Sequence, residues 1–312
     1  MSDEDEYGAY QALAGDSGDQ RWAFGTGFTD PLEGITVPAR GDDPPEPPGS
    51  SVPPGVDGAA LAAYCLMLGD DALIYSHRLQ QWVTRAPELE EETALANIAL
   101  DLLGQARMLL ARAASLTTPA DDSGRGEDRL AFFRDEGEFR NVRLVERADA
   151  DFAELAGRLL VFSAWRLALF EALTASADPV LAAVAAKGVK ELTYHRDYAA
   201  QWVIRLGDGT DLSHAKMQAA LAVVWPLVDE LFTPHPVEAA LAGVAAGGRA
   251  LRAGVDAVLD TVLAAATLNR PEAVPLAGVA GRTGRDGVHT EAFGYVLAEL
   301  QSVARADPDA TW

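Results

Sequence analysis

The chain lacks the features that mark several classes of protein. Cys65 is its single cysteine among 312 residues, so neither an intrachain disulfide nor a cysteine-rich metal cluster can form. Its first residues, MSDEDEYGAY, have neither the basic nor the apolar region of a secretory signal. We also find no apolar run of the roughly 18 residues that a membrane span requires. These absences predict a cytoplasmic protein without a membrane segment.

Positive charge is scarce as well. The chain has 47 acidic and 25 basic residues, which gives a formal net charge of −22. Proteins that bind nucleic acids or anionic membranes present a basic surface to the phosphates. We therefore expect no nucleic-acid partner and no membrane partner. The acidity itself is typical of a well-solvated surface.

Signals for β-structure are few, since no stretch alternates apolar and polar residues with a period of two. The clearest pattern lies in residues 87–116, where apolar residues recur every three or four positions, as in a helix that buries one face. These residues are Leu95, Ile98, Ala99, Leu102, Ala106, Leu109, Leu110 and Ala113. The opposite face carries Glu90, Asn97, Asp101 and Arg112.

The same spacing predicts further helices over 57–83, 151–176, 179–206, 237–268 and 288–305, with another after the turn at 207–214. In the helix over 237–268 we expect an irregularity near Gly247 and Gly248. Arg166 and His195 fall within apolar arcs of these helices. A buried arginine is costly unless it is paired, so we expect a carboxylate to meet Arg166 or the helix to rotate it outward. The pattern indicates an all-α protein built as a long-helix bundle with accessory helices.

Composition divides the chain at about residue 55. Residues 1–55 are acidic and proline-rich, which predicts an extended or disordered arm. Two interpretations are open: a dispensable tail, or an arm that wraps a partner with Trp22, Phe24 and Phe28 as aromatic anchors. Residues 56–312 then form one helical domain that includes the last helix and the tail.

A charged segment over 127–146 has two open interpretations, a partner surface or a solvated cap at one end of the bundle. Its candidate contact residues are Arg129, Phe132, Phe133, Arg134, Glu138, Phe139, Arg140 and Arg143.

Long-helix bundles commonly hold di-iron centres, which use Glu-x-x-His to place a carboxylate and an imidazole on one helical face. Glu-x-x-His does not occur in this chain, and Asp-x-x-His occurs only at 211–214 and 286–289, in expected loops or helix starts. Zinc helices, nucleophile elbows and phosphate-binding loops are also missing. The residues alone therefore predict a bundle without an evident catalytic site.

Four sequence blocks resemble the C subunits of bacterial phenylacetyl-CoA 1,2-epoxidases, over residues 57–312. The blocks are LGDDALIYSHRLQQWVTRAPELEEETALANIALDLLGQARMLL, EDRLAFFRDEGEFRNVRLVE, AAKGVKELTYHRDYAAQWVIRLGDGTDLSHAKMQAAL and GVHTEAFGYVLAELQ. The resemblance implies a ferritin-like, non-catalytic structural subunit that holds no cofactor. It pairs with a catalytic di-iron subunit, which epoxidises the aromatic ring of phenylacetyl-CoA with O₂, and the heterodimer assembles further. A small assembly subunit and an NADPH reductase act indirectly.

The resemblance also implies a vestigial metal site. Where the catalytic relatives have Glu-x-x-His, this chain has Leu102 with Gln105 on one helix and Leu192 with His195 on another. Asp71 lies close to the place of the first-helix ligand. We expect Gln105, His195 and an ion pair between Asp71 and Arg166 to fill the space between the helices.

Two rival functions remain open at this point. One is a self-sufficient di-iron or di-manganese oxidase with Asp71, Asp101 and His195 as unconventional ligands, although Asp101 is expected on the polar side of its helix. The other is a standalone helical adaptor.

Overall fold

The computed structural model describes residues 51–117, 126–308 and 310. Their regular structure is helical, apart from one isolated bridge between Val279 and Arg282, so the prediction of an all-α, ferritin-like bundle is confirmed. The expected arm, including Trp22, Phe24 and Phe28, lies almost wholly outside the described residues.

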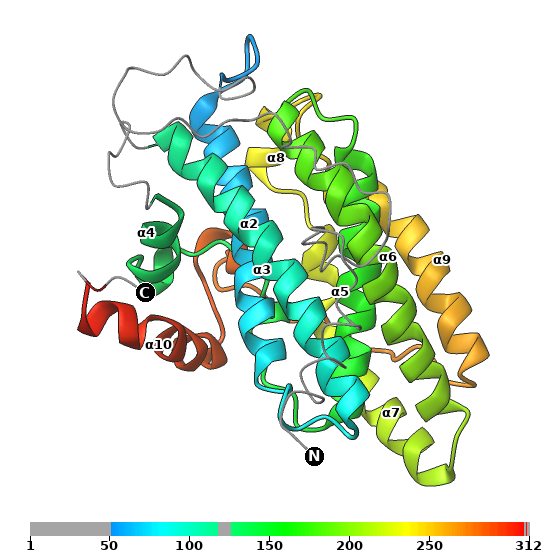
Figure 1. The fold of residues 1–312 in the computed structure, drawn as a ribbon. Helices are drawn as coiled ribbons and strands as arrows, with labels where there is room; N and C mark the ends of the chain where they lie inside the picture. The colour runs from blue at the N-terminus through cyan, green and yellow to red at the C-terminus, as the bar shows by residue number, and fades with distance from the viewer. Residues whose placement is uncertain (1–50, 118–125, 309, 311–312) are drawn as a thin grey trace, which may run out of the picture. The chain divides into compact units, whose positions relative to one another are not determined.

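Four long helices form the bundle (Figure 1): α2 (Gly58–Gln80), α3 (Leu89–Thr117), α5 (Phe152–Leu173) and α6 (Pro179–Gly207). α2 packs on α3, α5 packs on α6, and α3 also meets α6. Between α2 and α5, the rings of Tyr75 and Phe162 meet edge to face with their centroids 4.5 Å apart. The four helices therefore enclose one shared core.

Acidic caps explain where three of these helices begin. The side chains of Asp57, Asp151 and Asp178 each accept a hydrogen bond from a backbone N–H in the first turn of the following helix. Pro179 then occupies the first position of α6, where its fixed φ and missing N–H cost nothing. Because these signals are local, the long helices begin and end within a few residues of their predicted bounds.

The accessory helices are α4 (Gly126–Phe132), α7 (Asp211–Val224), α8 (Pro236–Ala240), α9 (Gly248–Ala265) and α10 (Glu291–Ala306). Short 3₁₀ turns lie at Glu136–Glu138, Arg143–Val145, Trp225–Leu227, Asp229–Phe232 and Gly284–Asp286. α7 and α9 pack against α5 and α6, whereas α4 contacts α3 and α10 contacts α2 (Figure 1).

The single helix predicted over 237–268 is wrong, because the chain divides it into α8 and α9. Leu241 ends α8, and Gly243 adopts a φ of 77° that glycine tolerates better than other residues. Leu241 and Val244 turn into the core on either side of it. The turn between α8 and α9 thus places two apolar side chains in the core.

Buried ion pairs connect distant parts of the chain. Five arginines, each at most 9% exposed, meet a buried carboxylate. The pairs are Arg112–Asp178 (2.6 Å), Arg143–Glu230 (2.7 Å), Arg285–Asp71 (2.8 Å), Arg134–Asp70 and Arg158–Asp149. Burying such charges is tolerable only because each is matched and hydrogen-bonded.

One of these residues corrects the helical-wheel prediction. Arg112 was expected on the polar face of its helix, yet it is buried, as is Asp70. Arg134, which follows α4, reaches over α2 and binds Asp70, while Arg112 binds the Asp178 carboxylate that also caps α6. A wheel shows the direction of a side chain but not the distant segment that covers it.

The candidate partner surface over 127–146 is also only partly on the surface. Arg134, Phe139 and Arg143 are buried, with the Arg134 guanidinium 4.0 Å from the centre of the Phe139 ring. Arg129, Phe133 and Glu138 are exposed, and Phe132 and Arg140 are half-buried. Arg134 binds Asp70 of α2, and Arg143 binds Glu230 of the 3₁₀ turn Asp229–Phe232. A solvated cap would not make such buried contacts.

Contrary to the sequence expectation, α2 and α3 each have the length and hydropathy of a membrane span. Each contains an 18-residue window of mean hydropathy 1.3. In α2, 72% of that window is buried inside the protein, as in a core helix, whereas in α3 the buried share is 44%.

The Asp70 pair provides a test of the buried charges. Asp70→Asn leaves the Arg134 guanidinium buried without its counter-charge, so we expect a loss of about 3 kcal/mol in the free energy of unfolding. Urea denaturation measures this change. Glu127→Gln is the control, because the partner of Glu127 is the exposed Arg107 and such pairs contribute about 1 kcal/mol or less. Equal losses in the two variants would contradict this explanation.

Candidate functional site

The six residues predicted to fill the centre of the bundle are all buried, each at most 1% exposed. They come from all four long helices: Asp71 from α2, Leu102 and Gln105 from α3, Arg166 from α5, and Leu192 and His195 from α6. Helical spacing predicted the inward positions of Leu102, Arg166, Leu192 and His195, and the resemblance those of Asp71 and Gln105, but neither predicted all of their partners.

Arg166 is held without a carboxylate in direct contact. Its Nε donates to Gln105 Oε1 at 2.9 Å, and both terminal nitrogens lie 3.2 Å from the Leu68 carbonyl oxygen. The faces of the Phe170 and Phe162 rings lie 4.5 and 5.7 Å from the guanidinium carbon. Burial lowers the pKa of Arg166 to about 10. Neutral acceptors and aromatic faces thus hold a buried cation.

The expected ion pair between Asp71 and Arg166 is not formed. Asp71 is instead bound by the two terminal nitrogens of Arg285, at 3.0 and 2.8 Å, and by the backbone N–H of Val142 at 2.8 Å. Burial raises the pKa of Asp71, and the Arg285 charge opposes that rise. Arg285 lies 214 residues further along the chain, so spacing within the helices could not predict this contact.

Gln105 links the buried cation to a carboxylate near the surface. Its Nε2 donates to Glu191 Oε2 at 2.9 Å while its Oε1 accepts from Arg166. An amide side chain can do both at once, because it carries an acceptor oxygen and a donor nitrogen. Burial raises the pKa of Glu191 to about 7, and the nearby Asp101 charge adds to the rise.

Sequence reasoning missed Glu191. It precedes the buried Leu192 on α6, and its side chain curls back to Gln105 at the seam with α3. The available signal was that Glu191 lies one helical turn before the core residue His195.

His195 also finds its partner at this seam. Its Nε2 lies 3.0 Å from Asp101 Oδ2, so Asp101 turns toward α6 and not simply toward solvent. Burial lowers the pKa of His195, which the Asp101 carboxylate opposes. Asp101 was expected on the polar side of α3, away from the core.

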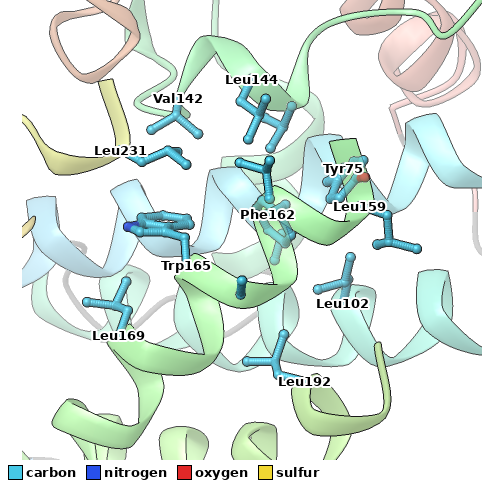
Figure 2. Close-up of a cluster of buried hydrophobic side chains, with 14 of the residues drawn as sticks. Tyr75, Leu102, Val142, Leu144, Leu159, Phe162, Trp165, Leu169, Leu192 and Leu231 are labelled. Atoms are coloured by element: carbon cyan, nitrogen blue, oxygen red, sulfur yellow. The ribbon is translucent and has the colours of Figure 1, made fainter. Parts of the chain in front are cut away.

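Apolar side chains complete the site. Leu102 of α3 and Leu192 of α6 lie on the same side of Phe162 and belong to one continuous buried cluster (Figure 2). They stand where the resemblance would place metal-binding glutamates in a catalytic relative. Their methyl groups cannot donate electrons to a metal or neutralise its charge.

The residues present do not fit a di-metal centre. Such centres need several converging carboxylates and imidazoles. Within residues 51–117, 126–308 and 310, no three His, Cys, Asp or Glu side chains are grouped so that they could hold a metal ion. The Arg166 guanidinium, which has no carboxylate in direct contact, would also repel a metal cation in this space.

Two cavities lie elsewhere in the described structure. A surface depression of about 320 Å³ between α6 and α9 is lined by Arg196, Ala257, Val258, Thr261 and Val262. A second space of about 10 Å³, with Trp165, Glu230 and Arg285 in its wall, has room for about one water. Neither is lined by Arg166, Gln105 or His195.

Comparison with known proteins agrees with the resemblance seen in the sequence. A family model described as phenylacetic acid catabolic protein matches residues 49–312. The C subunit of the 1,2-phenylacetyl-CoA epoxidase of Escherichia coli strain K12 is 45% identical over 255 residues. That alignment covers 81% of this chain and 99% of the relative.

The raised pKa of Glu191 makes stability depend on pH. An unfolded glutamate ionises near pH 4.5, whereas folded Glu191 keeps its proton up to about pH 7. Between these values the folded chain binds the extra proton, so this group makes stability fall as pH rises and adds no further change above pH 7. As the pH rises from 4.5 to 7, the free energy of unfolding of Glu191→Gln should therefore gain about 3 kcal/mol relative to that of wild type.

Urea denaturation at pH 5, 6, 7 and 8 measures this gain. Glu90→Gln, an exposed glutamate on α3, is the matched control. A gain that is the same at all four values would mean that the Glu191 proton does not contribute.

Proposed function

Since this chain belongs to the phenylacetic acid catabolic protein family, we propose that it is the non-catalytic, structural subunit of a phenylacetyl-CoA epoxidase that acts in aerobic phenylacetate degradation. The relative, which is named as the C subunit of such an enzyme, supports membership of an epoxidase complex. The finer assignment, that this subunit stabilises its partner and performs no chemistry, is our proposal. It is supported by what lies at the centre of the bundle.

The observation that carries the proposal is the Arg166–Gln105–Glu191 chain of hydrogen bonds. It fills the space between α3, α5 and α6 with a cation, an amide and a carboxylate that satisfy one another. Leu102 and Leu192 close the remaining sides. Such a centre fixes the distances between helices but offers no open ligand position for O₂ or substrate.

We propose the catalytic di-iron subunit as the direct partner, in a heterodimer that assembles further. The small assembly subunit and the NADPH reductase would be reached indirectly. The name of the relative supports partner subunits in general, since a subunit designated by a letter implies others. We propose no cofactor for this chain and a cytoplasmic location.

The rival di-metal oxidase is disfavoured by the contacts of its proposed ligands. Asp71 is bound by Arg285 near the 3₁₀ turn Gly284–Asp286, while Asp101 and His195 bind each other at the α3–α6 seam. The three side chains do not form a group that could hold a metal. A standalone adaptor would have no catalytic partner. The following experiment therefore distinguishes it from our proposal.

Metal content and turnover test the function together. The chain is produced in iron-replete medium, once by itself and once together with the catalytic subunit from the same organism. We expect iron only in the co-purified complex, because Leu102, Leu192 and Arg166 occupy the centre of the bundle and no metal-binding group is found among the described residues. Ring epoxidation of phenylacetyl-CoA should also require the catalytic subunit.

His195→Gln separates a structural role from a catalytic one. If His195 only packs and bonds to Asp101, turnover per complex should stay close to wild type. Loss of a general acid or base costs about 10²-fold or more. About two irons in the isolated chain, or a loss of that size, would refute the structural assignment, and failure to co-purify with the catalytic subunit would favour the adaptor.

A further inference from the structure

α3 is more apolar than its packing within this chain explains. α2 and α3 have windows of equal mean hydropathy, 1.3, yet 72% of the window is buried in α2 and only 44% in α3. α3 packs on α2, α4 and α6, and its inner face already carries Leu95, Leu102 and Leu109. The remaining apolar residues of α3 therefore lie on a face that nothing described in this chain covers.

This outer face has its own helical stripe, which we call the outer stripe of α3. It consists of Asn97, Leu100, Leu103, Gly104, Arg107 and Ala111, spaced three or four residues apart. Leu100 is 58% exposed and Leu103 is 38% exposed. Isolated surface leucines are ordinary, but neighbouring ones on a helical stripe mark an interaction surface.

Gly104 is the second observation. Glycine weakens the middle of a helix, so it normally has a steric reason to be there. At Gly188 of α6 the reason is internal, because a Cβ would lie 2.6 Å from the Phe170 ring. At Gly104 a Cβ would meet nothing within 4 Å. The described residues therefore leave room for another chain to approach the helix closely at Gly104.

Charge indicates what that neighbour is. In a chain of net charge −22, the outer stripe carries one charged side chain, Arg107, and it is basic. Arg107 lies 3.4 Å from Glu127, yet its side chain stays 77% exposed and can meet a second carboxylate. Asp101, beside the stripe, is engaged by His195. The stripe thus fits an apolar helix with a carboxylate opposite Arg107. Two copies of the same acidic chain would instead repel each other over the rest of their surfaces.

The N-terminal segment is a weaker candidate for the neighbour. The Escherichia coli relative is aligned over 99% of its length with only 81% of this chain. The family match likewise begins at residue 49. About a fifth of this chain therefore has no counterpart in that relative, and the family match leaves out residues 1–48, so this segment is not a general means of covering the helix.

We infer that the outer stripe of α3 receives a helix of the catalytic subunit, with an aliphatic side chain of that helix seated over Gly104 between Leu100 and Leu103. This inference rests on the proposed function, since it needs the catalytic subunit as partner. It locates the contact on the helix that also supplies Leu102 and Gln105 to the core.

The test measures the affinity of separately purified catalytic subunit for the full-length chain and its variants. Gly104→Leu and the double variant Leu100→Asp/Leu103→Asp should each raise Kd by about tenfold or more. Leu212→Asp is the matched control, because Leu212 is 70% exposed on α7, and its Kd should equal that of wild type. Gly104→Ala should raise the Tm of the isolated chain and yet weaken binding, a combination that simple misfolding cannot produce.

Each other result overturns the inference in a different way. If wild type binds and the stripe variants bind equally well, the contact lies elsewhere and the proposed function stands. If wild type does not bind the catalytic subunit, the proposed function fails and this inference with it. A homodimer that Leu100→Asp/Leu103→Asp converts to monomer would assign the stripe to a second copy. Protection of α3 from hydrogen exchange that disappears when residues 1–50 are deleted would assign it to that segment.

Discussion

The burial of the Arg166 guanidinium is the constraint on which the centre of this bundle depends. Removing a cation from water costs several kcal/mol, and the side chain recovers that cost only where acceptors already point at it. Leu68 supplies its carbonyl oxygen, Gln105 its amide oxygen, and Phe162 and Phe170 their ring faces. Gln105 is then fixed in turn, because its amide must face Arg166 with oxygen and Glu191 with nitrogen. One buried charge thereby sets the relative positions of α2, α3, α5 and α6.

The same electrostatic rule holds the accessory segments on the bundle. Each buried carboxylate on a long helix is bound by an arginine that comes from another part of the chain. Asp71 and Asp70 of α2 receive Arg285 and Arg134, and Asp178 at the start of α6 receives Arg112. Because a charge left unpaired in the core is strongly destabilising, these contacts make the loops part of the fold. The basic groups of the 127–146 segment serve this internal purpose more than a surface one.

These contacts also explain what could be predicted from the sequence. Periodicity and acidic caps are local, so the long helices and the inward positions of Leu102, Arg166, Leu192 and His195 followed from spacing, whereas the position of Gln105 followed from the family resemblance. Four of the five buried ion pairs join residues 60 to more than 200 positions apart, as Arg285 and Asp71 are, and no local pattern contains them, whereas Arg158 and Asp149 are 9 positions apart. Glu191 was missed because its position alone does not show that its long side chain turns back to Gln105. Gly243 broke a predicted helix because alanine-rich spacing on both sides concealed one left-handed residue.

α3 connects the core with the proposed interface, since its inner and outer faces are separated by single residues. Leu102 and Gln105 point into the core, while Leu103 and Gly104 between them point outward. Asp101 and Glu191 lie at the boundary, in contact with His195 and Gln105. A helix lying on the outer stripe would remove water from these two carboxylates and favour the protonated form of Glu191 further. Partner binding and the hydrogen bonds around Arg166 would then be linked through the same two side chains, so the core could respond to assembly.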